Sequence, residues 1–319
     1  MLALLLTLIP IFLAVIAGLS GSPYVIRSTT SLLMWIALTQ SLNTIVGYTG
    51  RIHFGHVMFF GIGAYTATLL YIHAGLPWYI SIAAAPLVAA LFAIAIGYPT
   101  LRLHGAYFAI ATWSFAEMLK QIALNTELLG KGFGIPLPSP LNNIQILTIY
   151  ALIASLSVAL NVSIERSRIG RALNAIRDNE TVASAVGINT TFYKVLAYTL
   201  SSIPASLAGA SYAFWIGYVY AGDVFAGLKT DTMFMMLLLG GMGNYVGPLI
   251  GSIVFHVKYE ILWAQIGEQL YMVLLGVFIV LIVLFMPYGL SGFLGLQTVS
   301  ARKLLLTLSI KDLKSSLKM

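Results

Sequence analysis

Residues 165–189 read ERSRIGRALNAIRDNETVASAVGIN, and this polar stretch determines how the rest of the chain can be arranged. It holds seven charged residues up to Glu180, in a chain that is only 8% charged, and long apolar segments flank it on both sides. Two short helices here would place apolar side chains on one side and charged ones on the other. The apolar set is Leu173, Ile176, Ala183 and Val186, and the charged set is Arg171, Arg177, Asp178 and Glu180. Such an island is either a solvated loop or a docking element, and its pattern alone favours neither.

The composition indicates an all-α membrane protein that crosses the bilayer many times. Of 319 residues, 59% are hydrophobic and the mean hydropathy is +0.93, whereas a soluble domain has roughly 45–50% apolar and about 25% charged residues. The net charge is +7. In a membrane protein, such an excess of Lys and Arg usually lies in the cytoplasmic loops and does not indicate nucleic-acid binding. The chain has no cysteine, which excludes disulfides and cysteine-ligated metals.

Apolar runs near the ~20 residues that a spanning helix needs predict roughly nine or ten membrane elements, at least one of them broken. The runs cover residues 2–19, 26–46, 54–73, 78–98, 105–123, 144–164, 192–217, 232–262 and 270–288. The first is interpreted as an uncleaved span because a signal peptide would have a positive start. Residues 1–296 then form a transmembrane domain with a cytoplasmic loop at 165–191, and residues 297–319 form a basic cytoplasmic tail.

The basic loops set the predicted orientation. The island and the tail carry the most Lys and Arg, which places both, and the N-terminus, in the cytoplasm. The run 232–262 is too long for one helix, and its glycines and Pro248 break it. We therefore expect a half-helix that enters and breaks, followed by a full span from about residue 248 to 263, which also gives the tail its cytoplasmic side.

Glycine breaks occur in both halves of the chain. The first-half set is Gly47, Gly50, Gly55, His56, Gly61 and Gly63, and the second-half set is Gly240, Gly241, Gly243, Gly247, Pro248 and Gly251. Interrupted segments in two halves of a transporter indicate a translocation site. For any single glycine, close helix packing is at least as good an explanation.

Other polar residues point to no enzyme chemistry. Glu117, with Lys120 three residues on, is either a structural ion pair or part of a pathway, and Thr112 could line the same pathway. His53 and His56 lack a third ligand, so no metal is predicted, and no cofactor is expected. The only glycine–lysine candidate for a phosphate loop, at Gly130, lacks the required spacing. ATP hydrolysis would therefore belong to another polypeptide.

Several motifs are shared with one family. Each motif alone is weak evidence, but together and in this order they are specific. They are Gly47-Tyr48-Thr49-Gly50 with Gly55-His56, FFGIGAY at 59–65, Leu101-Arg102-Leu103 with Gly105 and Tyr107, Gly170-Arg171-Ala172, Ala175-Ile176-Arg177, Gly187-Ile188-Asn189 with Tyr193-Lys194, and Leu239-Gly240-Gly241-Met242-Gly243 with Gly247-Pro248 and Gly251. From residue 42 to 294 the chain resembles the membrane subunit of branched-chain amino acid ABC importers. It departs from the family pattern at Arg51, His53, Ala106 and Tyr288.

The resemblance implies a function and a set of partners. It implies a permease that acts with ATP-binding subunits, a second homologous permease subunit, an extracytoplasmic substrate-binding protein and the lipid bilayer, and not with nucleic acid. The residues expected to couple to the ATPase are Arg171, Ala172, Leu173, Ile176, Arg177, Glu180, Ala183 and Gly187, with Leu173, Ile176 and Val182 seated in the partner's groove. The alternatives are an ion-coupled secondary transporter, which the scarcity of charges in the spans disfavours, and a permease for urea or a short amide.

Overall fold

The computed structural model describes residues 2–103, 105–266, 277 and 289–293. These residues form a bundle of helices, and the strands among them are the two-residue β1 (Ile135–Pro136) and β2 (Tyr218–Val219), which pair antiparallel. The all-α class predicted from composition is confirmed. The predicted tail, and the predicted span at 270–288 apart from residue 277, lie outside the described residues.

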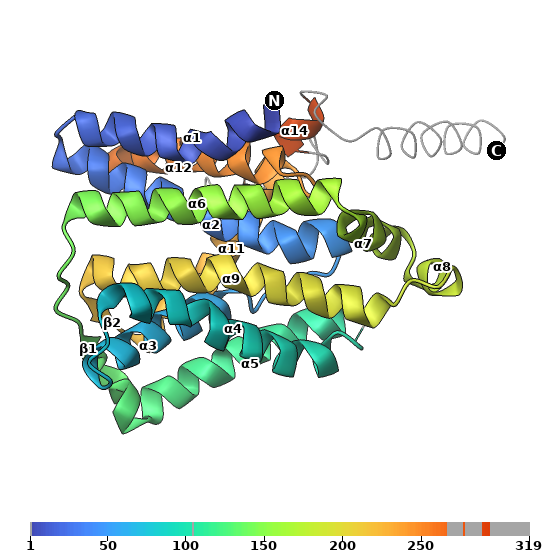
Figure 1. Cartoon of the computed structure of the whole chain (residues 1–319), viewed down its shortest axis with the longest axis horizontal. Coiled ribbons are helices and arrows are strands. Elements are labelled where there is room, and N and C mark those ends of the chain that lie inside the picture. The colour runs from blue at the N-terminus through green and yellow to red at the C-terminus, as the bar shows by residue number, and fades with distance from the viewer. Residues whose placement is uncertain (1, 104, 267–276, 278–288, 294–319) are drawn as a thin grey trace.

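The helices follow the apolar runs closely (Figure 1). Their bounds are α1 (Leu2–Leu19), α2 (Pro23–Thr49), α3 (Val57–Ile72), α4 (Trp78–Thr100), α5 (Ala106–Asn125), α6 (Asn143–Arg166), α7 (Arg168–Asp178), α8 (Glu180–Ala185), α9 (Thr190–Ile216), α10 (Ala221–Val224), α11 (Gly227–Gly240), α12 (Val246–Ile266) and α14 (Gly289–Phe293). Two single 3₁₀ turns, Glu127–Leu129 and Lys131–Phe133, follow α5. The short α7 and α8 project from one end of the bundle, and β1 and β2 lie at the other end (Figure 1).

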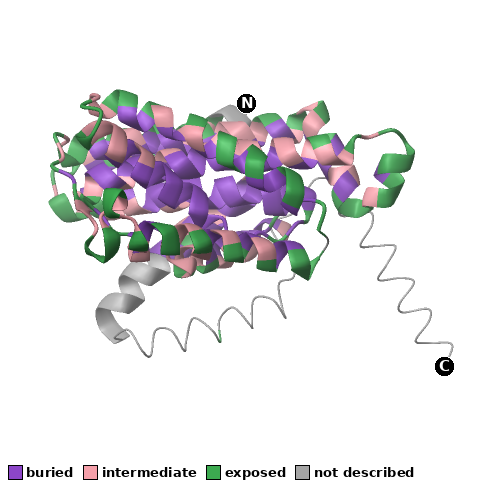
Figure 2. Cartoon of the chain, turned by 90° about the horizontal axis from the view of Figure 1, so that it is seen from below, coloured by how far each residue is buried: buried purple, intermediate pink, exposed green. Residues whose placement is uncertain are grey.

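Helix α2 is the centre of the bundle. It packs against α6, α9, α11, α12 and α1, and every residue from 36 to 49 is buried. Figure 2 shows this buried interior running along the middle of the molecule. The buried part of α2 is partly polar, with Gln40, Ser41 and Asn43 among apolar neighbours. A helix in this position needs no uniformly apolar surface, because other helices and not lipid cover it.

Small residues let α3 and α9 cross with their backbones almost in contact. A Cβ added at Gly63 would lie 2.0 Å from the carbonyl oxygen of Ser206, and one added at Gly209 would lie 1.9 Å from that of Phe60. A Cβ at Gly61 would enter the ring of Phe225. Gly61 and Gly63 therefore act in helix packing and do not interrupt α3, as the packing explanation of the glycine motif allowed.

The long run at 232–262 breaks where the sequence predicts. Helices α11 and α12 form a hairpin: Gly240 lies against Gly247, and Gly251 lies against Met236. The turn at residues 241–245 is at the end of the bundle that carries α7, where Arg177 and Glu165 reach it. The break therefore lies at this end of the bundle. The first part, α11, has 14 residues, fewer than the ~20 of a full span, and the second part, α12, has 21.

Two of the described helices are both long and apolar enough to cross a membrane, namely Trp78–Thr100 and Asn143–Arg166. Helix α2 has the length but carries the buried polar residues described above, which lower its hydropathy. Length and hydropathy alone do not separate such helices from the core helices of a soluble protein.

Candidate coupling site

The island at 165–189 folds as two capped helices. Ser167 accepts hydrogen bonds from the backbone N–H groups of Ile169 and Gly170 at the start of α7, and Asn179 accepts one from Val182 at the start of α8. Gly187 ends α8 with a φ of +89°, and the backbone N–H of Ile188 reaches back to the carbonyl of Ala183. This is the Schellman ending that a glycine favours. Asn179 therefore caps α8, and Gly187 ends it.

The apolar face of α7 points into the permease chain itself. Leu173 and Ile176 are buried among other helices of this chain, as are Ala172 and Ala183. They are therefore not free to enter a partner's groove, contrary to the expectation for Leu173 and Ile176. The apolar side chains exposed on and just after α8 are Val182 (58% exposed) and Val186 (72%), although the sequence pattern placed Val186 on the inner side. Arg171 and Gly187 are exposed as well.

Glu180, the first residue of α8, joins three connections at this end of the bundle. One carboxylate oxygen accepts from the guanidinium of Arg51, in the connection between α2 and α3, and the other accepts from the ammonium of Lys194, in α9. Arg51 also donates to the carbonyl of Leu103, and Lys194 donates to the carbonyl of Leu101 at 3.1 Å, both in the connection between α4 and α5. We call Arg51, Glu180 and Lys194 the charge triad.

The charge triad is largely shielded from solvent, which sets its electrostatics. The side chains of Arg51, Glu180 and Lys194 are 9%, 25% and 4% exposed. Partial burial by itself raises the pKa of the Glu180 carboxyl, but hydrogen bonds from Lys194 and Arg51 and their positive charges outweigh it and hold the pKa below its usual value. Glu180 is therefore ionised at neutral pH.

Arg177, near the end of α7, makes a second link from the island to the bundle. Its Nη1 donates to the carbonyl oxygen of Gly47 in α2 at 2.9 Å. The same atom lies 2.3 Å from where a Cβ of Gly243 would be, in the turn between α11 and α12. Gly50 ends α2 with a φ of +69° and packs under the Arg177 stem. The two glycine breaks, far apart in sequence, thus meet at one arginine.

Buried polar groups hold that turn against α2 and α6. Asn43 accepts from the backbone N–H of Gly243 at 3.0 Å and donates to the carbonyl of Asn244 and to the side chain of Asn161. Asn161 donates in turn to the carbonyl of Gln40 at 2.9 Å. Each group is satisfied by a neighbour on another element, so the network fixes the relative position of α2, α6 and the turn.

Two further bonds complete this network at the turn. The backbone N–H of Tyr245 donates to the carboxylate of Glu165 at 3.2 Å, and Gln40 donates to the carbonyl of Tyr245 at 2.7 Å. Glu165 is the first residue of the polar island. The turn is therefore held both by the island and by the central helix.

The remaining predicted residues lie away from this site. His56 is buried and bonds the hydroxyl of Ser41. A Cβ at Gly55 would meet the carbonyl of Thr112 at 1.9 Å, and the Thr112 hydroxyl is used within α5. Thr112 is thus buried within the bundle. Glu117 lies on the far side of α5, paired with Lys120 at 3.2 Å.

Sequence reasoning missed the polar residues that connect the site. Asn43, Asn161 and Lys194 had no predicted role, and Arg51 stood out only as a departure from the family pattern. A signal was present: residues 40–44 read QSLNT inside an apolar run. Several uncharged polar side chains within one turn or so of a span indicate a helix that contacts other helices, since lipid would leave them unpaired.

Comparison with known proteins decides the class. The sequence profile of the family described as "Branched-chain amino acid transport system / permease component" matches residues 24–283, most of the chain. The chain belongs to this family. It is a multi-pass membrane protein and the permease subunit of an ABC importer, which confirms the role that the motifs predicted. A permease component acts with the other components of its transport system.

Individual relatives agree with the family. The chain is 29% identical over 294 residues to the high-affinity branched-chain amino acid transport system permease protein LivM of Salmonella typhimurium, covering 82% of this chain and 68% of the relative. It is 31% identical over 137 residues to LivH of the same organism, covering 42% and 43%. A probable LivM of Methanocaldococcus jannaschii is 26% identical over 213 residues, covering 60% and 61%. No solved structure gives a significant match.

Proposed function

We propose that this permease carries branched-chain amino acids and that separate ATP-binding subunits drive it by docking on α7 and α8. The relatives' names supply the substrate class. A second, homologous permease subunit would complete the pathway, and an extracytoplasmic binding protein would deliver the substrate. The end of the bundle with α7 and α8 would face the cytoplasm, together with both chain termini, because the basic residues of the island gather there.

The observation that carries the docking proposal is the division of the island into a fixed face and a free face. The fixed face, with Leu173, Ile176 and Arg177, is held by α2, α6 and the turn at 241–245. The free face presents Val182 and Val186, one helical turn apart. A loop that only obeyed the positive-inside rule would need neither two capped helices nor a rigid connection to the core.

The connections suggest how motion would pass from the ATPase to the bundle. A displacement of α8 moves Glu180, which holds α9 through Lys194 and the α2–α3 connection through Arg51. A displacement of α7 moves Arg177 and with it α2 and the α11–α12 turn. ATP binding would thereby shift several helices at once and expose the pathway alternately to the two sides.

Docking is tested by placing a charge on the free face. Val186→Asp should abolish co-purification of the ATP-binding subunits with the permease, because the partner would have to bury an unpaired carboxylate. Leu128→Asp is the control, since Leu128 is 58% exposed but lies in the connection after α5, at the other end of the bundle. Both variants should insert into the membrane normally. Retained association of the Val186→Asp permease would refute docking at α8.

A further inference from the structure

Helix α5 is held to the rest of the permease along a narrow strip. Of its 20 residues five are buried: Phe108, Ala109, Thr112, Ala116 and Ala123. Figure 1 shows α5 at the edge of the bundle, on the opposite side from α1 and α12. The rest of its surface is available to whatever surrounds this chain in the membrane.

The exposed face of α5 is partly polar, unlike a surface made for lipid. Ile110, Trp113, Ser114, Glu117 and Gln121 recur at the spacing that places residues on one side of a helix. We call these five residues the α5 face. Lys120 and Gln121 both donate to the Glu117 carboxylate, and the Glu117 and Lys120 side chains are 41% and 27% exposed.

The charged pair lies deep along the helix. Glu117 is eleven residues after Ala106, the first residue of α5, which is about 17 Å at 1.5 Å per residue. The hydrocarbon layer is about 30 Å thick, so Glu117 falls near its middle when α5 spans it. Ionised groups at this depth face a protein interior or a water-filled cavity, because lipid cannot solvate them. Long side chains near a helix end can reach the headgroups, but a glutamate at the middle cannot.

We infer that the α5 face is a wall of the translocation pathway and contacts the zwitterionic substrate, an inference that rests on the proposed transport of branched-chain amino acids. Glu117 receives the substrate ammonium group and Lys120 its carboxylate, exchanging their mutual ion pair for pairs with the substrate. Trp113 and Ile110, one and two turns closer to the coupling end, contact the branched apolar side chain. The second permease subunit closes the pathway from the opposite side.

The position of α5 relative to the charge triad supports this role. The connection that leads into α5 is held by Arg51 at the carbonyl of Leu103 and by Lys194 at the carbonyl of Leu101. Movement of α8 therefore reaches the first turn of α5 directly. Because few side chains hold the remainder of α5 to the bundle, the helix can tilt without disrupting the core.

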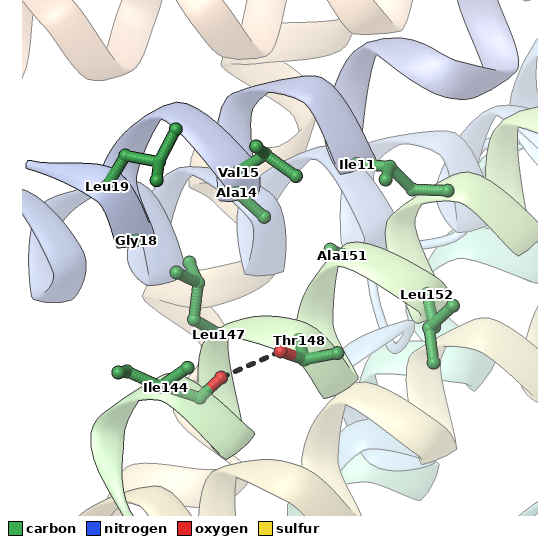
Figure 3. A pocket seen from close by; sticks show the side chains of 10 residues that line it. All are labelled: Ile11, Ala14, Val15, Gly18, Leu19, Ile144, Leu147, Thr148, Ala151 and Leu152. Carbon is green, nitrogen blue, oxygen red and sulfur yellow. Dashed lines mark hydrogen bonds between the residues drawn. The ribbon is translucent and has the colours of Figure 1, made fainter.

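Thiol accessibility tests whether the α5 face meets water. The chain contains no cysteine, so one introduced cysteine is its sole target. In the assembled transporter in membranes, Ser114→Cys should react with a charged methanethiosulfonate reagent at least about tenfold faster than a lipid-facing thiol, because the reactive thiolate forms in water. Leu152→Cys is the matched control: Leu152 is 59% exposed on α6 and lines an apolar groove between α1 and α6 (Figure 3). Equal, slow reaction at both positions would overturn the inference.

Substitution of Glu117 tests contact with the substrate. Glu117→Gln should lower leucine uptake per ATP hydrolysed by about tenfold or more. The glutamine would offer the substrate ammonium group only a neutral acceptor, and hydrogen bonds to charged groups are stronger than those between neutral groups. Glu117→Asp should restore part of the uptake. Glu127→Gln removes an ion pair of similar sequence spacing outside the spanning part of α5 and should leave uptake unchanged. Unchanged uptake in Glu117→Gln would refute substrate contact, whereas a wild-type complex that does not transport leucine at all would refute the proposed function instead.

Discussion

Glu180→Gln is the substitution that tests the charge triad most directly. Glu180 accepts from both Arg51 and Lys194, and each of these cations is more than 90% buried as a side chain. Glutamine keeps one acceptor oxygen, but its NH₂ group would face the second cation. The variant therefore loses one charge-assisted bond entirely and weakens the other.

The magnitude follows from the values of such bonds. A hydrogen bond to a charged group contributes about 1.5–3 kcal/mol and a neutral one about 1 kcal/mol. Losing one and weakening the other gives a net destabilisation of about 2–4 kcal/mol, in the range expected for breaking a largely buried pair. For a chain of this size that is a fall in unfolding midpoint of roughly 5 °C.

Thermal unfolding of the purified permease in detergent measures this shift, with Glu127→Gln as the control. The Glu127–Lys131 pair is exposed, with side chains 84% and 48% accessible, so its loss should cost less than about 1 kcal/mol. A midpoint for Glu180→Gln within a degree of the control would show that the charge triad does not stabilise the fold.

The same variant carries a pH signature. The pKa of Glu180 is lowered in the folded protein, so its ion pairs stabilise the fold fully above the ordinary value of 4.5 and lose their effect as the pH falls through the lowered value. Between neutral pH and mild acid, the difference in midpoint between wild type and Glu180→Gln should stay constant, and it should shrink below pH 4.5. A difference that grew on acidification would contradict the assignment.

Three further predictions use the same unfolding assay. Gly47→Ala should lower the free energy of unfolding by about 1–3 kcal/mol, because its Cβ would meet Asn43 Oδ1 at 2.0 Å. Gly18→Ala, with open space around it, should be neutral, and equal effects of the two substitutions would refute the steric argument. Asn161→Leu should cost about 1–3 kcal/mol, since it strips partners from buried groups of α2; a stable variant would show that the network is dispensable. Lys194→Met should destabilise the fold more than Arg51→Gln. The glutamine keeps an N–H donor for Glu180, whereas the methionine keeps none. The reverse order would make Arg51 the main partner of Glu180.

The sequence predicts the elements of the coupling site better than their contacts. Asn179 and Gly187 act through bonds to residues three to five positions away, so their roles as cap and terminus are encoded locally. The periodicity of Leu173 and Ile176 predicts that they share a face, and they do. It does not say which protein covers that face, and here the cover is the permease itself.

The polar contacts were less accessible to prediction for a different reason. Asn43 and Asn161 are 118 residues apart in sequence, and Arg51 and Glu180 are 129 apart. A polar residue in an apolar run indicates that a partner exists, but its partner depends on how the helices are arranged in space. The break at residues 241–245 shows the same limit: glycine and proline locate it, whereas its position at the α7 end follows from contacts with α2 and α6.

In the proposed docking, the two links from the island would divide the work of coupling between different parts of the bundle. Arg177 connects α7 to α2 and the α11–α12 turn, whose polar network resists deformation because every member is bonded across elements. Glu180 connects α8 to α9 and, through Arg51 and Lys194, to the carbonyls that lead into the loosely held α5. Since a displacement is taken up where packing is weakest, a push on α8 should move α5 more than it moves α2. The rigid link would then keep the ATPase in register with the core while the charge triad transmits the motion to the pathway.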